Sequence, residues 1–283
     1  MGTYFQHKIS IPPIKCFPLN LTDKPATIEF LTHHRPQIVF HSAAAVNVDE
    51  CETNRKPTFA TNVEATKTLV DTVSKWNALV VYISSDAFFD GGTGSFKESD
   101  TPTPINYYGE TKLLAEEYIK NNSAQYLNIR TNLYGWNYQP KLSFAEWILV
   151  NIYNKKHIPL VNDVFYTPIL TNKLVQAVAE LIKRKKQGTY NITSSRRISK
   201  YEFANILCTI FELDPSFIDK ASVKTLKLIA KRSENMALDN TKVATELPEI
   251  SFEVEDHLRE FKDKYLNGYV QKLRGESALP KLF

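Results

Sequence analysis

LVVYI at residues 79–83, followed by SSD at 84–86, is the stretch from which the fold can be predicted. The run is continuous and β-branched, which is typical of a strand covered on both faces. A loop rich in Asp, Gly, Ser, Thr and Pro leads from it to a helix expected over about Tyr107–Ile119. Another strand is expected at Tyr126–Arg130. Strand, helix and strand at this spacing predict a parallel βαβ unit.

The same alternation extends toward the N-terminus. A short apolar run, Gln37–Phe40, lies between a proline and a cluster of small residues. Over Pro57–Trp76 the apolar positions lie mostly on one helical face, which predicts a helix. The sequence therefore predicts an α/β protein with a doubly wound, parallel, Rossmann-type sheet.

The pattern becomes mixed after about residue 136, where short strands and helices predict a smaller α+β lobe. A capping box, Ser199 with Glu202, marks the start of one of these helices. The expected helices are Ser143–Asn154, Asn172–Lys185, Lys200–Phe211 and Val254–Leu266, and the expected strands are Ile158–Val161 and Thr189–Ile192. We expect residues 1–140 to form a cofactor-binding domain, to which segments near 166–193 return, and residues 141–283 to form most of a substrate-binding lobe.

Composition excludes several classes of protein. The chain has 283 residues, 43% hydrophobic and 23% charged, unlike a disordered protein. Its net charge of +4 is not the basic stripe of a nucleic-acid binder. No apolar stretch approaches the ~20 residues that span a bilayer, and the N-terminus lacks the apolar core of a signal peptide, so we expect a cytoplasmic protein without a membrane partner.

Cysteine and histidine give no sign of a metal site. Cys16, Cys51 and Cys208 form neither a disulfide framework nor a metal-binding pair. Of the six histidines, His33 and His34 are adjacent and would diverge on a helix. We expect no metal.

Tyr108 and Lys112 are four residues apart at the start of a predicted helix, so they share one face. Ser85 and Asp86 end the preceding strand, and the crossover should bring that strand end and the helix start to one rim of the sheet. A phenol has a pKa of about 10, and a nearby ammonium lowers that pKa. A serine hydroxyl can orient a carbonyl while the tyrosine donates a proton to its oxygen. These residues predict carbonyl reduction.

The segment 81–118, VYISSDAFFDGGTGSFKESDTPTPINYYGETKLLAEEY, resembles the active-site stretch of the extended short-chain dehydrogenase/reductase superfamily, and within it the dTDP-4-dehydrorhamnose reductase branch. Four other segments carry the resemblance: PLNLTD at 18–23, IVFHSAAAVNVDECE at 38–52, LVNDVFYTPILTNKL at 160–174 and TYNITSSRRISKYEFA at 189–204. The resemblance implies an NAD(P)-dependent oxidoreductase that reduces a keto group on a nucleotide-linked deoxysugar, with NADH or NADPH, in polysaccharide biosynthesis.

The resemblance also implies roles for individual residues. Ser85, Tyr108 and Lys112 would be catalytic, with Tyr108 as proton donor. Ser85 and Asp86 would contact the sugar, although Asp86 could instead serve the turn that follows it. The residues implied to bind the cofactor are Gly2, Asn20, Leu21, Ala44, Ala45, Val46, Tyr108 and Lys112. Asn62 matches an asparagine close to the family's active site, and a purely structural amide is the competing interpretation.

The sequence departs from the family at two places. The family begins with a central strand and a glycine-rich loop, whereas Met1–Phe5 resembles only the last glycine of that loop and the first turn of the helix after it. Either a truncated sequence or a natural loss would explain this. An aromatic residue after Ser-Asp is replaced by Ala87, and a tryptophan of the next strand by Asn132 or Leu133. Another nucleotide sugar or carbonyl compound therefore stays open as substrate.

Two alternatives to the reductase remain. Sugar-nucleotide epimerases and dehydratases share this fold and the Tyr/Lys pair. Some members of the branch are non-catalytic binding subunits, such as the regulatory subunit of methionine adenosyltransferase, and the absent glycine loop favours such a role. A homodimer is the oligomeric state we consider, and the choice between NAD and NADP stays open.

Overall fold

The computed structural model describes residues 1–9, 13–92, 94–138 and 141–274. The chain divides into two compact units, each built from separate parts of the sequence. The first unit comprises Met1–Ser84 and Asn106–Asn128, and the second comprises Ser85–Ile105 and Ile129–Phe283. The domain ranges expected from the sequence, 1–140 and 141–283, stay a prediction.

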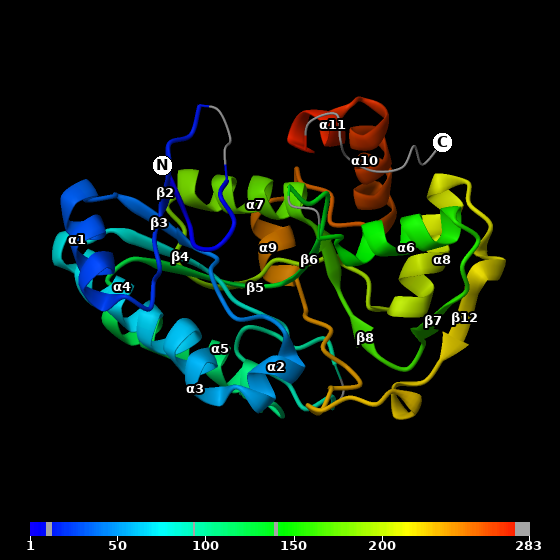
Figure 1. Ribbon diagram of the computed structural model, residues 1–283, viewed down its shortest axis with the longest axis horizontal. Helices are drawn as coiled ribbons and strands as arrows, with labels where there is room; N and C mark the ends of the chain where they lie inside the picture. The colour runs from blue at the N-terminus through cyan, green and yellow to red at the C-terminus, as the bar shows by residue number, and fades with distance from the viewer. Residues whose placement is uncertain (10–12, 93, 139–140, 275–283) are drawn as a thin grey trace. The chain divides into compact units, whose positions relative to one another are not determined.

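The first unit is a layered α/β structure in which helices pack on parallel strands (Figure 1). Its strands are β1 (Gly2–Tyr4), β2 (Cys16–Pro18), β3 (Ile38–His41), β4 (Leu79–Ile83) and the first part of β5 (Tyr126–Arg130). Its α-helices are α1 (Lys24–His34), α2 (Val48–Thr53), α3 (Arg55–Phe59), α4 (Ala65–Val73) and α5 (Tyr107–Asn122). A π-helix, Ala60–Glu64, joins α3 to α4, and a 3₁₀ turn, Ser74–Trp76, follows α4.

One sheet has the strand order β10-β5-β4-β3, in which β10 is Gly188–Asn191. Strand β3 pairs with β4 in parallel from Ile38↔Leu79 to His41↔Tyr82. The middle of β4 is buried on both faces, as its continuous apolar sequence predicts: Val80 and Val81 are 0% exposed and Tyr82 is 1% exposed. Helices α4 and α5 pack on Val80 and Tyr82 through Leu69, Val73 and Ile119. The expected parallel α/β fold is confirmed.

The N-terminal residues differ from the expectation. Met1–Phe5 was expected to end a loop and begin a helix, but Gly2–Tyr4 is an extended strand that pairs in parallel with β2, from Gly2↔Cys16 to Tyr4↔Pro18. The Gly2 N–H donates to the carbonyl oxygen of Lys15 over 2.8 Å. Backbone groups that a helix would pair within one turn are thus paired with a second strand, and the helical expectation is wrong.

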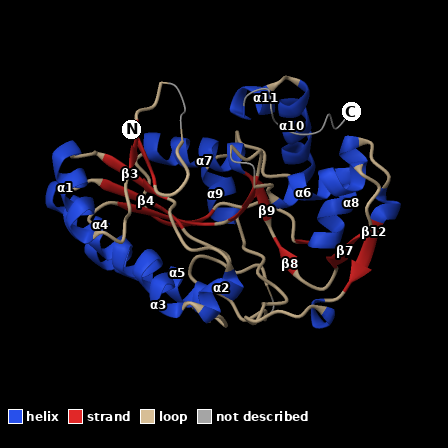
Figure 2. Ribbon diagram, viewed as in Figure 1, coloured by secondary structure: helices blue, strands red, loops and turns tan. Residues whose placement is uncertain are grey.

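The second unit has its own core and a mixture of short strands and helices (Figure 2). Its strands are β6 (Asn132–Tyr134), β7 (Ile158–Val161), β8 (Phe165–Tyr166), β9 (Pro168–Leu170), β10 (Gly188–Asn191), β11 (Ile198–Ser199) and β12 (Ile218–Ala221). Its α-helices are α6 (Phe144–Tyr153), α7 (Thr171–Lys183), α8 (Lys200–Phe211), α9 (Thr241–Glu246), α10 (Val254–Leu266) and α11 (Tyr269–Arg274). The chain contributes Ser85–Ile105 to this unit and returns to it at Ile129, partway along β5.

Local signals in the sequence explain where two helices of the second unit, α6 and α8, begin. The Ser199 hydroxyl accepts from the Glu202 N–H over 3.1 Å, and the Glu202 carboxylate accepts from the Ser199 N–H over 2.7 Å. This is the capping box that the sequence predicts at the start of α8. Helix α6 begins with the same arrangement at Ser143 and Glu146. Strands β6 and β9 pair in parallel, and β8 pairs antiparallel to β11.

Candidate active site

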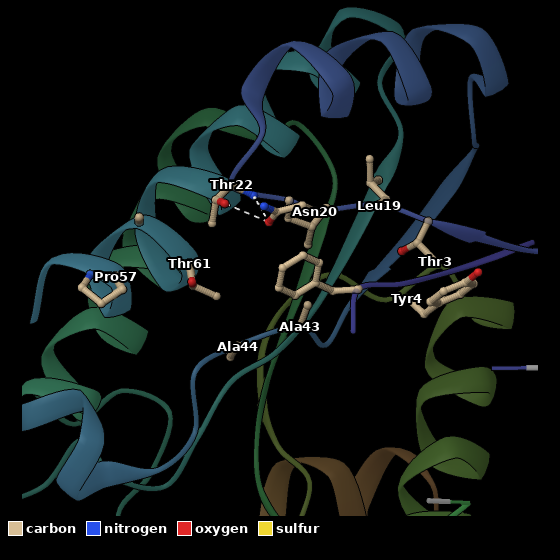
Figure 3. A pocket seen from close by; sticks show the side chains of 12 residues that line it. Thr3, Tyr4, Leu19, Asn20, Thr22, Ala43, Ala44, Pro57 and Thr61 are labelled. Atoms are coloured by element: carbon tan, nitrogen blue, oxygen red, sulfur yellow. Dashed lines mark hydrogen bonds between the residues drawn. The ribbon is translucent and has the colours of Figure 1, made fainter. Parts of the chain in front are cut away.

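A pocket of about 450 Å³ opens in the first unit, within the range of small-molecule sites. It is lined by Thr3, Tyr4, Phe5, Leu19, Asn20, Leu21, Thr22, Ala43, Ala44, Pro57, Ala60 and Thr61. These residues come from β1 and the residue after it, the loop after β2, the loop after β3 and the α3/π-helix segment, and Figure 3 shows how nine of them lie around the pocket. All twelve are uncharged, so the pocket suits a neutral, largely apolar group such as a purine base.

Asn20 is oriented within this pocket by its own loop. Its Oδ1 accepts from the Thr22 N–H over 3.1 Å and from the Thr22 hydroxyl over 2.8 Å (Figure 3). Both hydrogen bonds of the amide oxygen are therefore made within the protein, and they fix the plane of the Asn20 side chain. The Asn20 N–H₂ group is the donor that this loop can offer to an acceptor atom of a ligand.

Asn62 fixes the backbone of the small-residue loop after β3. Its Oδ1 accepts from the Ala45 N–H over 2.7 Å, and its Nδ2 donates to the Ala45 carbonyl oxygen over 3.1 Å and to the Thr111 hydroxyl over 3.0 Å. Asn62 is 1% exposed and lies on the π-helix, a conformation frequent at functional sites. The amide therefore ties this loop to α5, and the structural interpretation of Asn62 accounts for all of these bonds.

Tyr108 and Lys112 lie on the first two turns of α5. The helix begins where the Asn106 side chain accepts from the Gly109 N–H over 2.9 Å. A carboxylate oxygen of Glu52 accepts from the Tyr107 N–H over 3.0 Å, which adds negative charge at the helix N-terminus. Tyr108 is half-buried, and Lys112 is 2% exposed. The start of α5 is thus fixed on both sides of Tyr108.

The ammonium of Lys112 lies in an apolar and aromatic environment. Its Nζ donates to the carbonyl oxygen of Ile83 over 2.8 Å and lies 4.1 Å from the centre of the Tyr82 ring. Burial lowers the pKa of Lys112 to about 7, and the carboxylate of Glu116 opposes this shift. Glu116 is itself buried and accepts from the Ser84 hydroxyl over 2.9 Å. An amine in this environment can change charge near neutral pH.

His41 is buried against the same tyrosine. Its Nε2 lies 2.8 Å from the Thr66 hydroxyl, and its ring lies 5.4 Å from that of Tyr82. Burial, with a smaller contribution from Lys112, lowers the pKa of His41 to about 3. The imidazole is therefore neutral and structural. Among the residues that the structure describes, no group of three or more His, Cys, Asp or Glu could hold a metal ion.

Ser85 and Asp86 follow β4 and belong to the second unit, where both are buried. The Ser85 hydroxyl accepts from the Ala87 N–H over 3.1 Å and donates to Asp86 Oδ1 over 3.4 Å. Asp86 Oδ2 accepts from Asn132 Nδ2 over 2.7 Å. Burial raises the pKa of Asp86 to about 6, although these hydrogen bonds and Lys200 lower it.

Besides Tyr108 and Lys112, six residues are predicted to bind the cofactor, and three of these six line the pocket. The pocket brings together Asn20, Leu21 and Ala44, which come from separate loops. Gly2 precedes the lining residues, Ala45 is held through its backbone, and Val46 is 59% exposed. Their roles stay predictions. Sequence reasoning missed the Asn132–Asp86 bond, because nothing local marks a contact between residues 46 positions apart.

A parallel α/β sheet, a pocket beside the loop after β3 and a Tyr/Lys pair one helical turn apart define a protein of the extended short-chain dehydrogenase/reductase class. Residues 4–267 match one family of this class. The chain belongs to the RmlD substrate binding domain family.

Three individual proteins illustrate what this chain is similar to. The chain is 26% identical over 233 residues to a probable low-salt glycan biosynthesis reductase of Haloferax volcanii, covering 81% of this chain and 78% of that protein. It is 26% identical over 234 residues to the beta subunit of methionine adenosyltransferase 2 of Pongo abelii, covering 80% and 70%. The crystal structure of a dTDP-4-dehydrorhamnose reductase from Bacillus anthracis in complex with NADP superposes with a TM-score of 0.82 at 23% identity, covering 89% and 90%.

No helix in the described parts of the chain is both long and apolar enough to span a membrane. The cytoplasmic location and the homodimer expected from the sequence stay predictions.

Proposed function

We propose that the chain reduces a keto group on a nucleotide-linked deoxysugar with NADH or NADPH, with Tyr108 as the proton donor. The observation that carries this proposal is the first unit itself. It combines an uncharged pocket of about 450 Å³ with a helix that presents Tyr108 and Lys112 one turn apart. The family assignment, the reductase of Haloferax volcanii and the NADP held by the Bacillus anthracis enzyme support it.

The pocket fits the adenine end of such a dinucleotide. Its lining is uncharged, the Asn20 amide is oriented with its N–H₂ group available, and hydroxyls of Thr3 and Thr61 lie on its walls. Asn20, Leu21 and Ala44 would hold the base, and the backbone of Ala45 and Val46 would continue the contact surface. When bound, the dinucleotide supplies the hydride that reduces the carbonyl carbon.

The residues of this chain move the proton. Tyr108 would donate its phenolic proton to the carbonyl oxygen as that oxygen gains negative charge, so the keto group becomes a hydroxyl and a phenolate remains. The positive charge of Lys112 would favour that phenolate. Ser85 would orient the carbonyl through its hydroxyl, and Asp86 would contact the sugar. General acid catalysis of this kind contributes about 10²–10⁴-fold to the rate.

The test is a comparison of binding with turnover. The full chain is titrated with NADH and NADPH by calorimetry, and NAD(P)H oxidation is followed with dTDP-4-dehydrorhamnose. The proposal expects saturable binding of at least one dinucleotide and turnover that Tyr108→Phe reduces by at least about 10²-fold with dinucleotide affinity unchanged. Tyr107→Phe is the matched control on the adjacent position of α5 and should retain turnover. Turnover that survives in Tyr108→Phe would contradict the assigned role.

A second candidate is a non-catalytic binding subunit. The similarity to the beta subunit of methionine adenosyltransferase 2 favours it. That similarity covers 80% of this chain, and the similarity to the Haloferax volcanii reductase covers 81%. This candidate would be supported over the reductase if the chain bound a dinucleotide and a partner enzyme, and if wild type and Tyr108→Phe had the same effect on the activity of that partner.

A further inference from the structure

The carboxyl group of Asp86 is held by one short hydrogen bond and has capacity for another. Asn132 Nδ2 donates to Oδ2 over 2.7 Å, whereas the Ser85 hydroxyl reaches Oδ1 only over 3.4 Å. Asp86 is 4% exposed. A carboxylate accepts several hydrogen bonds, so Oδ1 keeps an acceptor position for a further donor.

Tyr166, also in the second unit, has a buried hydroxyl group without a hydrogen bond. The residue is 4% exposed, and no described residue donates to or accepts from its hydroxyl. Burying a hydroxyl without a partner is unfavourable, which makes such a group in a folded protein a candidate for contact with a ligand. Burial raises the pKa of Tyr166 well above its ordinary value, with further contributions from Tyr134 and Asp86. The phenol therefore keeps its proton and can donate.

Strand pairing within the second unit places the segments that carry Asn132, Tyr166 and Lys200 next to one another. Asn132 on β6 is opposite Pro168 on β9, two residues after Tyr166. Tyr166 on β8 is opposite Ile198 on β11, two residues before Lys200. Lys200 is close enough to Asp86 for each charge to affect the pKa of the other. Asn132 and Lys200 are half-buried, so the cluster reaches the surface of the unit at these two side chains.

We propose that Asp86, Asn132 and Tyr166 form a subsite that binds a hydroxyl group of the deoxysugar, an inference that rests on the proposed function. The sugar hydroxyl donates to Asp86 Oδ1 and accepts from the Tyr166 hydroxyl. Asn132 is a positioning residue, because its bond to Oδ2 fixes the direction in which Oδ1 points. Lys200 supplies positive charge beside the carboxylate. The subsite thus selects the sugar rather than the nucleotide.

The test measures the part of the binding that comes from the sugar. The affinities of the full chain for dTDP-rhamnose and for dTDP are compared by calorimetry. Tyr166→Phe removes only the hydroxyl, and we expect it to weaken dTDP-rhamnose binding by about tenfold while leaving dTDP and NADPH binding unchanged, since one hydrogen bond is lost. Asn132→Ala should weaken dTDP-rhamnose in the same way, and Asn132→Gln, which keeps the amide, should recover part of the loss.

Tyr134→Phe is the matched control. Tyr134 is 3% exposed, and its hydroxyl also has no partner among the described residues. Burial raises the pKa of Tyr134, with a smaller contribution from Glu260 and none from Asp86. We expect this variant to bind both ligands as wild type does. Equal dTDP-rhamnose affinity in wild type and Tyr166→Phe, or equal weakening of both ligands, would overturn the subsite. A wild-type chain that neither binds dTDP-rhamnose nor oxidises NADPH with dTDP-4-dehydrorhamnose would overturn the proposed function as well.

Discussion

The ammonium of Lys112 donates a hydrogen bond of 2.8 Å to the carbonyl oxygen of Ile83, the last residue of β4. This bond joins the second turn of α5 to the end of the strand, within the first unit. It also holds a 2% exposed amine in a place where its charge is poorly solvated. The hydrogen bond that fixes the position of Lys112 therefore also keeps its ammonium group away from water.

The first prediction concerns the pH dependence of stability at Lys112. Burial lowers its pKa from 10.5 to about 7, so between these values the unfolded chain binds more protons than the folded chain. The free energy of unfolding must then rise with pH across that window. Lys112→Met removes this contribution. Urea denaturation at pH 7 and pH 9 should show a smaller increase in Lys112→Met than in wild type.

Lys120→Met is the control for this experiment, because Lys120 lies on the same helix and is exposed. Its denaturation should follow wild type at both pH values. Identical pH dependence in wild type and Lys112→Met would show that the amine is solvated in the native state.

The second prediction concerns acid stability at His41. Burial lowers its pKa from 6.5 to about 3, so between these values the unfolded chain again binds more protons. Stability should fall as the pH decreases through this window, by at most about 1.4 kcal/mol per pH unit from this group. His41→Gln, which can still pair with Thr66, should reduce that slope. Asp86 acts in the opposite sense, because its pKa is raised to about 6, so wild type and variant must be compared directly.

His33→Gln is the matched control, since His33 is exposed on α1. It should leave the slope between pH 4 and pH 6 unchanged. A His41→Gln slope equal to that of wild type would mean that the imidazole is protonated in the folded chain.

Much of this architecture follows from local sequence patterns. The sequence predicts helices at Lys200–Phe211 and Val254–Leu266, and both have those bounds. Apolar periodicity is encoded within each segment, and the first also has a capping box at Ser199 and Glu202. The helix expected over Pro57–Trp76 is instead divided by a π-helix at Ala60–Glu64. Periodicity alone does not reveal such a change, and it also does not reveal that Asn62, on the π-helix, pairs with the loop at Ala45.

The candidate site was only partly predictable for the same reason. Tyr108 and Lys112 are close in sequence, so helical geometry alone places them on one face. The Asn132 bond to Asp86 and the unpaired hydroxyl of Tyr166 depend on strand pairing across the second unit. No local signal in the sequence marks either one.

The third prediction concerns the pocket of the first unit. Thr61 lies on its wall at the π-helix (Figure 3). Thr61→Phe places a ring in the cavity, and we expect it to weaken NADH and NADPH binding by at least about tenfold because the ligand and the ring compete for the same volume. Thr225→Phe, in the second unit, is the control and should bind both as wild type does. Unchanged affinity in Thr61→Phe would exclude this pocket as the dinucleotide site.

The fourth prediction concerns a buried ion pair in the second unit. Arg274 on α11 donates to the carboxylate of Glu146 on α6, and the two side chains are 7% and 0% exposed. Removing one partner of a buried pair leaves an uncompensated charge and costs about 3–5 kcal/mol, whereas removing both costs less. Arg274→Ala should therefore destabilise the chain more than the double variant Arg274→Ala with Glu146→Gln does, as measured by urea denaturation in a double-mutant cycle.

The exposed pair Arg259–Asp256 gives the scale for this comparison. Its side chains are 63% and 49% exposed, so Arg259→Ala should change the free energy of unfolding by at most about 1 kcal/mol. Glu146 also accepts from the Ser143 N–H over 2.7 Å at the start of α6, so its carboxylate serves both the helix cap and Arg274. If Arg274→Ala costs no more than Arg259→Ala does, the Glu146 carboxylate is satisfied by the cap alone and α11 contributes no buried charge pair to the second unit.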